Sequence, residues 1–365
     1  AEIQTDFDPA SHAELFIINT DTRLVPPEKA ALIVGAVAKK ISQVGIENIF
    51  KKVDSVLRGP VLAELLELLI QSDRNRALLV PANPSHDRMI KNGWYWVKKT
   101  PLHQTDFAND PDYPATTSDV VAILSQRHRI KVSSKPQLTM RKPSETLSST
   151  GITIGEATSI EDIRVWAEIL HQDTMPSGAS DFFAAYLATL GYSPFEQKPV
   201  DRLCDSGKSL FVCGSSSKSA YLFCQTSEKT GVPVIRMPLK LLEMPDEYEP
   251  FVQDWTNATI DALRENDKVI LAINRSLSRL PGLPQRLMHY LGSVAKNIIT
   301  THPVNHLFLE GGATAASVLS WLEWYQLTVY KEFAPGVVCL KVKDHDFPCI
   351  TIKPGSYTWP AELVA

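Results

Sequence analysis

Short apolar runs rich in β-branched residues alternate with longer stretches of helical period along most of this 365-residue chain. In the first half, the runs at 13–20, 46–53 and 76–82 predict strands, and the stretches at 26–42 and 59–72 predict helices between them. Strands that alternate with helices fold as β-α-β units whose strands lie parallel in one sheet. The chain is therefore predicted to be an α/β protein with mostly parallel sheets.

A polar segment at 193–209 divides two series of these elements. Since one domain usually has about 100–200 residues, a chain of this length is expected to form two domains. We place the domains at residues 1–195 and 205–365, with the polar segment as their linker.

Within the first domain the alternation stops after residue 82. Residues 89–99 predict a hairpin that turns at Asn92 and Gly93, and a polar loop follows through 101–120. Loops of this length in compact domains usually serve function, so we expect this loop to contribute to a site.

Composition argues against two classes of partner. Apolar residues make up 44% of the chain, but no apolar run approaches the ~20 residues that cross a bilayer. Lys and Arg number 37 against 41 Asp and Glu, a net charge of −4, and no basic stripe with interleaved aromatic residues is present. We therefore expect neither a membrane nor a nucleic acid as a partner.

The cysteines point to a reducing compartment. The chain has 5 cysteines without a Cys-x-x-Cys pair, and three of them lie in apolar runs where reduced thiols pack as small hydrophobic groups. The first residues show no basic-then-apolar leader. Together these features predict a cytoplasmic protein.

Polar and cationic side chains follow the predicted strands of the first domain. Asp54, Ser55 and Arg58 follow the second strand, Arg88 follows the third, and Arg23 follows the first. Parallel α/β sheets bind ligands outside the carboxyl ends of their strands, and an Arg guanidinium can hold a carboxylate through two charge-assisted hydrogen bonds. These residues predict a site for an anionic, hydroxyl-rich molecule. A helix cap and surface ion pairs would explain each turn taken singly.

The second domain has three glycine-containing turns directly after predicted strands, within 212–219, 308–317 and 351–357. In such turns main-chain amides and hydroxyls at a helix N-terminus can face a phosphate group. Neither a P-loop nor a dinucleotide-binding glycine motif is present, and tight strand-to-helix turns would also explain the glycines. Three such turns in one domain predict a nucleotide site, whose candidate residues are Ser215, Ser217, Gly311, Gly312, Ala313, Thr314 and Gly355.

Metal and nucleophile sites are not predicted. His302 and His306 have the spacing of helical zinc ligands, but Pro303 disfavours a continuous helix through them. No Gly-x-Ser-x-Gly elbow is present. The sequence therefore assigns no metal ligand, no catalytic nucleophile and no catalytic base.

Several longer motifs occur together in the chain. They are "KKVDSVLRG" (51–59), "PANPSHDR" (81–88) and "PLHQTDFANDP" (101–111), followed by "GASDFFAAYL", "CGSSS", "GGATA" and "KPGSY". In this combination and order the chain resembles the four-carbon acid sugar kinase family, bacterial enzymes that phosphorylate tetronate or 3-oxo-tetronate acids with ATP. The resemblance covers nearly the whole chain.

This resemblance implies an N-terminal domain that holds the acid sugar, a C-terminal domain that holds ATP, and a ligand cleft between them. Carried over by motif, the sugar-acid contacts would be Asp54, Ser55, Arg58 and Arg88, and the ATP contacts would be Ser215, the turn 311–314 and Gly355.

Two departures from the family pattern stand out. Family members usually open with a strand and an Asp-Asp-x-Thr-Gly-Ala turn, and nothing here matches it, which predicts an N-terminal domain without that strand and the helix after it. The usual Gly-Gly-Asp-Thr turn has Ala313 in place of its carboxylate. If that carboxylate serves Mg²⁺ or proton transfer, another group must replace it, and Glu310 is the nearest acid in the sequence.

We therefore expect an ATP-dependent kinase, a phosphotransferase with an alcohol group as acceptor, that uses Mg²⁺ and phosphorylates a four-carbon sugar acid at its terminal hydroxyl. One alternative is a protein of the same fold that binds the nucleotide and the sugar acid without turnover. Another is an enzyme that acts on a phosphorylated sugar acid without ATP. The sequence leaves open which sugar acid is bound and whether the protein forms a homodimer.

Overall fold

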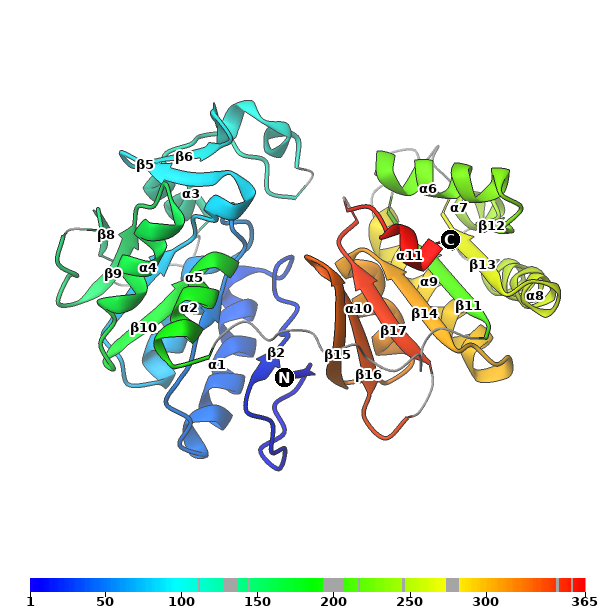
Figure 1. Cartoon of the computed structure of the whole chain (residues 1–365), viewed down its shortest axis with the longest axis horizontal. Coiled ribbons are helices and arrows are strands. Elements are labelled where there is room, and N and C mark those ends of the chain that lie inside the picture. Colours follow the sequence, from blue (N-terminus) through cyan, green and yellow to red (C-terminus); the bar gives the residue numbers. More distant parts are fainter. Residues whose placement is uncertain are drawn as a thin grey trace. The chain divides into compact units, whose positions relative to one another are not determined.

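The computed structural model describes residues 1–364, apart from 111, 128–136, 144, 193–206, 216, 245–246, 274–281, 346–347 and 356. Two compact units make up the chain (Figure 1). The five-stranded unit comprises 7–10 and 20–195, and the nine-stranded unit comprises 1–6, 11–19 and 196–365. The predicted class, an α/β protein with two domains and mostly parallel sheets, is confirmed. The predicted linker at 193–209 lies mostly outside the described residues.

The sheet of the five-stranded unit is parallel throughout. Its strands, in spatial order, are β3 (Lys51–Lys52), β10 (Thr174–Gly178), β4 (Arg76–Val80), β9 (Gly151–Gly155) and β8 (Leu138–Arg141). The central strand β4 is buried from Ala77 to Val80 because helices cover both faces of the sheet, as the continuous apolar run at 76–82 predicts.

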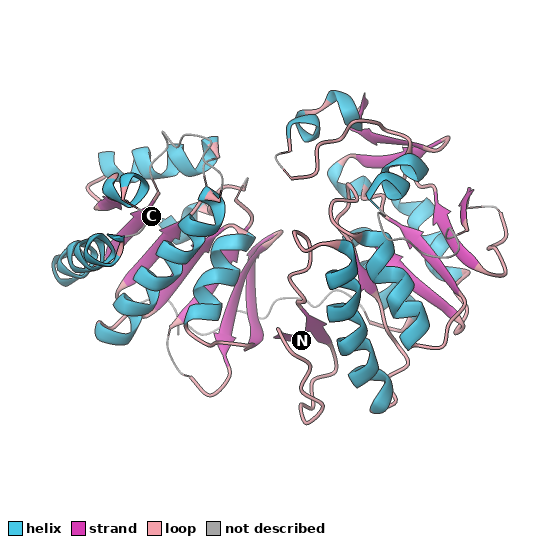
Figure 2. Cartoon of the chain, turned by 180° about the vertical axis from the view of Figure 1, so that it is seen from behind, coloured by secondary structure: helices cyan, strands magenta, loops and turns pink. Residues whose placement is uncertain are grey.

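In the part of this unit that the structure describes, the sheet is accompanied by α1 (Pro27–Gln43), α2 (Val61–Gln71), α3 (Val120–Arg127), α4 (Ile160–Glu168) and α5 (Ser180–Thr189) (Figure 2). Helix α2 packs against α1 and α3, whereas α4 packs against α5. The crossovers through α2 and α4 run in opposite directions across the sheet, so right-handed connections place these two helices on opposite faces.

A small antiparallel sheet adjoins the carboxyl ends of β4 and β9, to which it is joined by isolated bridges. Its strands are β5 (Arg88–Lys91), β6 (Trp94–Val97) and β7 (Thr100–Pro101). The predicted hairpin is present: Asn92 and Gly93 both have positive φ, 52° and 77°, as a two-residue type I′ turn requires. The polar loop beyond β7 contains two short 3₁₀ helices, Leu102–Gln104 and Asp106–Asn109.

The sheet of the nine-stranded unit is mixed. Its parallel part is β12 (Val234–Arg236), β13 (Lys268–Ala272), β11 (Ser209–Cys213), β14 (His306–Glu310) and β17 (Cys349–Lys353). It continues through antiparallel β16 (Val337–Val342) and β15 (Gln326–Ala334) to β1 (Glu2–Gln4) and β2 (Phe16–Ile18).

Two hydrophobic cores lie on the two faces of this sheet, because successive strand residues point to opposite sides. On β11, Leu210 and Val212 belong to the larger core, and Phe211 and Cys213 belong to the smaller one. The larger core includes residues of α7 (Lys240–Glu243), α8 (Glu249–Glu265), α9 (Leu283–Thr301) and α10 (Gly312–Trp321), and the smaller one includes residues of α6 (Lys218–Lys229) and α11 (Ala361–Val364).

Two predicted strands differ in the structure. The run at 13–20 forms only β2, which pairs with β1 at the edge of the nine-stranded sheet. The run at 46–53 forms only β3, since it has β10 on one side and no strand among the described residues on the other. Local pattern predicted both strands, but pairing partners determined their lengths and the sheet to which each belongs.

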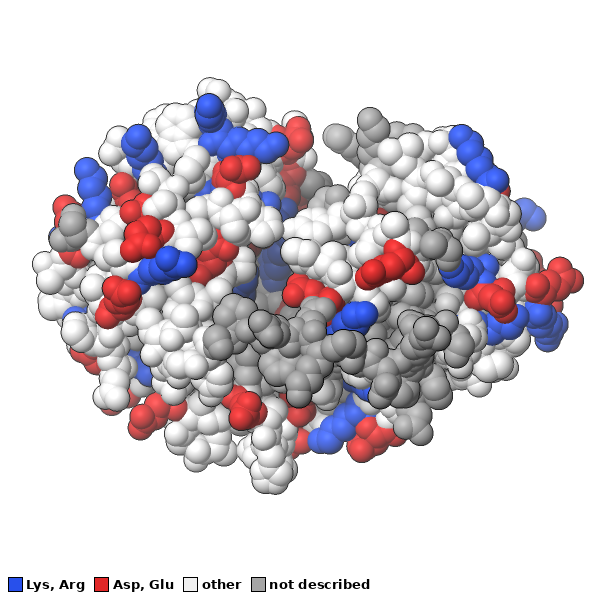
Figure 3. Space-filling model, viewed as in Figure 1, with Lys and Arg blue, Asp and Glu red and all other residues white. Residues whose placement is uncertain are grey.

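On the face shown in Figure 3, Lys and Arg side chains are interspersed with Asp and Glu, and no large patch of one sign is visible. In the described part of the chain, no helix is long and apolar enough to cross a bilayer.

Candidate functional site

The turn after β3 is organised by one carboxylate. Asp54 Oδ1 accepts hydrogen bonds from the amides of Val56 (3.1 Å) and Arg58 (3.2 Å), which folds the chain back on itself. The Arg58 guanidinium grips the same carboxylate twice, from Nε to Oδ1 at 3.0 Å and from Nη2 to Oδ2 at 2.8 Å. Burial acts to raise the pKa of Asp54, but the bonds from Arg58 outweigh burial and lower it.

The polar loop supplies a second acid to this arginine. Arg58 Nη1 donates to Asp110 Oδ2 at 3.0 Å, while the amide of Tyr113 holds Asp110 Oδ1 at 2.8 Å. Arg23 Nη2 lies 3.8 Å from the same oxygen, Asp110 Oδ2, and its side chain remains 45% exposed. Arg58 therefore serves two carboxylates of the protein itself, whereas Arg23 is more open to a ligand.

Arg88 completes the cationic cluster. Its Nη1 donates to Ser55 Oγ, and its guanidinium carbon lies 5.5 Å from the centre of the Phe107 ring. The guanidinium of Arg58 lies at the same distance from that ring, so both arginines have favourable cation–π geometry. The residues predicted from the sequence, Asp54, Ser55, Arg58, Arg88 and Arg23, are thus brought together by contacts with one another, with Asp110 and with Phe107.

Helix α3 holds the turn after β3 in place through Arg127. Arg127 Nη1 donates to the main-chain oxygen of Leu57, a fully buried residue whose φ is 63°. Gly59 follows with φ 92°, and a Cβ there would lie only 3.3 Å from the main-chain oxygen of Arg23. The close approach of two chain segments thus explains this glycine. Sequence reasoning missed Asp110, Phe107 and Arg127, although the length of the loop at 101–120 marked the region of the first two.

The end of β4 is tied to the start of α5 beside this cluster. Asn83 Oδ1 accepts hydrogen bonds from Ser180 Oγ (2.9 Å) and from the amide of Asp181 (3.0 Å). The Asp181 carboxylate in turn accepts from the amide and the hydroxyl of Ser85, at 2.9 and 2.7 Å. The main-chain N–H of Asn83 also donates to the main-chain oxygen of Arg88 at 2.7 Å. This network therefore fixes the position of the Arg88 backbone.

In the nine-stranded unit, the three predicted glycine turns follow neighbouring strands. Strands β11, β14 and β17 are adjacent and parallel, and their last residues, Cys213, Glu310 and Lys353, stand in register. The turns that follow must therefore meet at one edge of the sheet. Ligand sites of parallel α/β sheets lie at this edge.

Contacts among the turns confirm that they meet. A Cβ on Gly355 would lie 3.0 Å from Ser215 Oγ and 3.9 Å from Gly311 Cα, and one on Gly214 would overlap Thr314 Oγ1. Ser217 Oγ donates to the main-chain oxygen of Gly355 at 2.8 Å. The same hydroxyl caps α6, where it accepts from the amide of Ala220 at 3.1 Å.

Helix α10 begins inside this cluster without a side-chain cap. Gly311 has φ 95°, and its N–H donates to the main-chain oxygen of Lys353 at 2.8 Å. The first helical hydrogen bond runs from the N–H of Ala315 to the oxygen of Gly311 at 3.0 Å. Among the described residues, no partner is present for the amides of the intervening residues 312–314. Outside the neighbouring backbone of its own helix, no described atom lies within 4 Å of a Cβ built on Gly312, so open space borders Gly312, and Ala313 is also exposed. Free amides at a helix N-terminus are an anion site.

Glu310, the acid nearest to Ala313 in sequence, does not border this open space. Its side chain is fully buried, and its Oε1 lies 3.2 Å from the Lys353 ammonium. Burial raises the pKa of Glu310, and the positive charge of Lys353 offsets only part of that rise. In this arrangement the carboxylate is a partner of Lys353 and does not stand in for the acid that Ala313 replaces.

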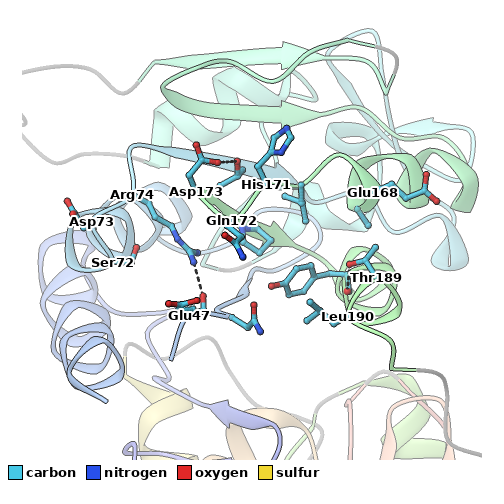
Figure 4. A pocket seen from close by; sticks show the side chains of 16 residues that line it. Glu47, Ser72, Asp73, Arg74, Glu168, His171, Gln172, Asp173, Thr189 and Leu190 are labelled. Atoms are coloured by element: carbon cyan, nitrogen blue, oxygen red, sulfur yellow. Dashed lines mark hydrogen bonds between the residues drawn. The ribbon is translucent and has the colours of Figure 1, made fainter. Parts of the chain in front are cut away.

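A hollow of ≈ 650 Å³ in the five-stranded unit lies elsewhere (Figure 4). It is lined by Glu47, Arg74 and Asp173, which precede β3, β4 and β10. It therefore opens at the amino ends of the strands, opposite the cationic cluster. Arg74 spans part of it by donating to the oxygen of Glu47 at 2.7 Å. None of the predicted site residues lines this hollow.

Comparison with known proteins agrees with a cationic cluster in one unit and glycine turns in the other. Residues 2–185 match the sugar-binding N-terminal domain of a protein family, and residues 210–357 match its nucleotide-binding C-terminal domain. The chain belongs to the four-carbon acid sugar kinase family.

Curated members of the four-carbon acid sugar kinase family resemble the chain distantly. It is 26% identical to the D-threonate kinase of Salmonella typhimurium, over 94% of this chain and 86% of that protein. It is 24% identical to the D-threonate kinase of Bordetella bronchiseptica, over 90% of this chain and 79% of that protein. A D-erythronate kinase of Heliobacterium modesticaldum is 30% identical over 38% of this chain and 32% of its own length.

Solved structures share the fold. A protein of Salmonella typhimurium described as a putative tRNA synthase superposes with a TM-score of 0.73 at 14% identity, covering 100% of this chain and 91% of that one. A Haemophilus influenzae protein superposes with a TM-score of 0.65 at 15% identity, covering 97% and 90%. At these identities the likeness concerns the architecture alone.

Proposed function

We propose that this chain is an ATP-dependent kinase that transfers the γ-phosphoryl group to the terminal hydroxyl of a four-carbon sugar acid, a tetronate or 3-oxo-tetronate. One observation carries the proposal. Beyond the carboxyl ends of its strands each unit gathers predicted residues: Arg58 and Arg88, with Arg23 near them, in the half that matches a sugar-binding domain, and amides without a partner among the described residues in the half that matches a nucleotide-binding domain.

On the sugar-acid side, Arg23 and Arg88 are the cations best placed to meet a carboxylate, and Ser55 can bond a sugar hydroxyl. Arg58 and Asp54 form the frame that supports them, because their bonds are already made to each other and to Asp110. This assignment refines the expectation that Arg58 itself grips the ligand.

On the nucleotide side, the amides of residues 312–314 and the turn at Gly355 would surround the phosphates. Phosphoryl transfer needs chiefly alignment of the reacting groups and neutralisation of charge, which fixed amides can supply. The proposed ATP contacts are Ser215, Ser217, Gly311, Gly312, Ala313, Thr314 and Gly355.

Mg²⁺ would supply further charge neutralisation when bound with ATP. Among the described residues, no group of three His, Cys, Asp or Glu side chains could hold a metal ion, and the carboxylate of Glu310 is taken by Lys353. The turns do offer hydroxyl and main-chain oxygens, such as those of Ser215. We therefore propose that the ion is held mainly by the nucleotide phosphates and water, as is common for Mg²⁺.

ADP release measured with a panel of four- to six-carbon sugar acids tests the proposal. We expect turnover that depends on both ATP and acid and is fastest with a four-carbon acid. ATP and sugar-acid binding in calorimetry without phosphoryl transfer would instead support the alternative of a binding protein, which Ala313 favours. An unchanged melting temperature in the presence of ATP would reject a nucleotide site altogether.

A further inference from the structure

A charged pair lies in the core directly beneath the proposed phosphate turns. Glu310 ends β14 and Lys353 ends β17, and both side chains are at most 1% exposed. The alternation of residues along β14 and β17 points both side chains into the smaller core, where the Lys353 ammonium also lies 5.1 Å from the centre of the Trp359 ring. The pair is thus isolated from solvent on the face of the sheet that faces α6 and α11.

A buried ion pair usually contributes little to the stability of a core. Removing two charges from water costs hydration free energy, and their mutual attraction offsets this cost only with near-ideal geometry. Well-packed apolar residues at the same positions often make the protein as stable. Here the Glu310 carboxylate has the side chains of Lys353, Cys213 and Trp359 near it, but neither of its oxygens accepts a well-aligned hydrogen bond from a described residue. Stability alone therefore gives a poor reason for Lys353 to be present.

The ammonium does have a second contact, and this one lies in a phosphate turn. Lys353 Nζ donates to the main-chain oxygen of Pro354 at 3.3 Å, an oxygen that also accepts from the amide of Tyr357 at 3.0 Å. The next carbonyl, that of Gly355, is bonded by the hydroxyls of Ser217 and Ser219 at 2.8 and 3.2 Å. Both peptide groups that flank Gly355 are thus held through their oxygens.

The orientation of these oxygens determines where an amide points. In a trans peptide the carbonyl oxygen and the following N–H lie in one plane and point in opposite directions. A Pro354 oxygen drawn toward the buried ammonium therefore directs the N–H of Gly355 away from that ammonium, in a turn that Ser215 and Gly311 border. No partner for this N–H is found among the described residues.

We propose that Lys353 is a positioning residue for the nucleotide: its buried amino group holds the Pro354 carbonyl on the core side, so that the Gly355 amide faces the bound phosphates, and Glu310 is the acid that lies beside it. The inference deepens the proposed function and rests on it. It also gives Glu310 a supporting role in place of contact with the ligand.

Three variants separate positioning from stability: Lys353→Met, Glu310→Gln, and the double variant Glu310→Leu/Lys353→Met. For each, ADP and ATP dissociation constants are measured by calorimetry, and the melting temperature is measured without ligand. Glu310→Gln keeps the ammonium and its contact with Pro354. Lys353→Met loses that contact and strands a buried acid, whereas the double variant loses the contact without leaving a buried charge.

We expect nucleotide affinity to follow the presence of Lys353. Both variants without Lys353 should bind ADP at least about fivefold more weakly, including the double variant, whose melting temperature should return close to that of the wild type. Glu310→Gln should bind with wild-type or higher affinity even though its melting temperature falls. These three results together would support the positioning role.

Two other results would overturn it, and they differ in what else they reject. If affinity falls in step with the melting temperature across the three variants, so that the double variant binds normally, Lys353 acts only through stability and the proposed kinase stands. If the wild-type protein binds neither ADP nor ATP, the proposed function itself fails, and the inference fails with it.

Discussion

The two candidate sites are built from different chemical groups: charged side chains in one and main-chain groups in the other. In the five-stranded unit, arginines and aspartates from the turn 54–58 and the loop 101–120 satisfy one another through charged side chains. In the nine-stranded unit, glycines bring main-chain groups together, and the amides of 312–314 have no partner among the described residues. The first site is therefore held in shape by the groups that form it, whereas the second is held in shape by its sheet and stays open.

This difference predicts that stability and ligand binding are coupled in one unit and separable in the other. A residue that bonds two neighbours cannot be removed without disturbing the frame, but a glycine that borders open space can gain a side chain at little cost. Substitutions in the two units should therefore behave differently.

The largest effect is expected for Arg58→Ala. The change leaves Asp54 and Asp110 without their shared cation in a site where the Arg58 side chain is only 20% exposed. The free energy of unfolding should fall by about 3 kcal/mol at pH 7, measured by urea denaturation. Arg23→Ala is the control, since its side chain is 45% exposed and 3.8 Å from Asp110, and it should cost less than about 0.5 kcal/mol. Equal stabilities for the two variants would contradict the frame assigned to Arg58.

Gly312→Val should show the reverse behaviour. The φ of Gly312 is not positive, and no atom lies within 4 Å of the position that a Cβ would occupy there, so the folded chain can accept the side chain. A branched side chain would fill the space that a phosphate needs, and ATP affinity should fall at least about tenfold, or about 1.4 kcal/mol. Calorimetry and a melting curve measured side by side test this. A loss of stability with unaltered affinity would exclude the turn as a phosphate site.

The pH dependence of stability tests whether the charge of Asp54 holds the site in the five-stranded unit together. The pKa of Asp54 is lowered in the folded state from its ordinary 3.8, so its charge stabilises the fold above that value and the stabilisation is lost as the pH falls through the lower, folded pKa. Asp54→Asn keeps an oxygen for the amides of Val56 and Arg58 but removes the charge. The variant should be less stable than wild type at pH 7, and the deficit should shrink below about pH 4. A deficit that stays constant with pH would assign the loss to shape and not to charge.

Ser217→Ala should have the smallest effect. It removes the cap of α6 and one of two hydroxyls on the Gly355 oxygen, so about 1 kcal/mol of stability should be lost. Ser219→Ala removes the second hydroxyl on that oxygen and its 2.9 Å hydrogen bond with Ser217 Oγ but keeps the cap, so it is the matched control, with a loss below about 0.5 kcal/mol. Identical losses in the two variants would contradict the capping role.

The sequence predicted the glycine turns well because their geometry is local. A glycine directly after a buried parallel strand must lie at the ligand edge of the sheet, and the register of β11, β14 and β17 then brings the three turns together. The hairpin at Asn92 and Gly93 was predicted for the same reason, since two residues set its form.

The charged cluster was predicted only in part because its bonds span long distances along the chain. Nothing near Arg58 in sequence shows that Asp110, 52 positions later, will share its guanidinium, or that Phe107 will lie over it. The contact between Lys353 and Glu310 likewise depends on strand register. Motif order located these regions, whereas pairing in three dimensions decided which atoms meet.

Leu57 imposes a narrow tolerance on the turn after β3. Its backbone is in the left-handed region, which a glycine or asparagine would adopt more easily, while its side chain fills a fully buried position that only a sizeable apolar group can occupy. A substitute that relaxes the backbone empties the core, and a β-branched one that fills the core increases the strain. Few amino acids can meet both demands, so the segment that presents Arg58 has little freedom to drift.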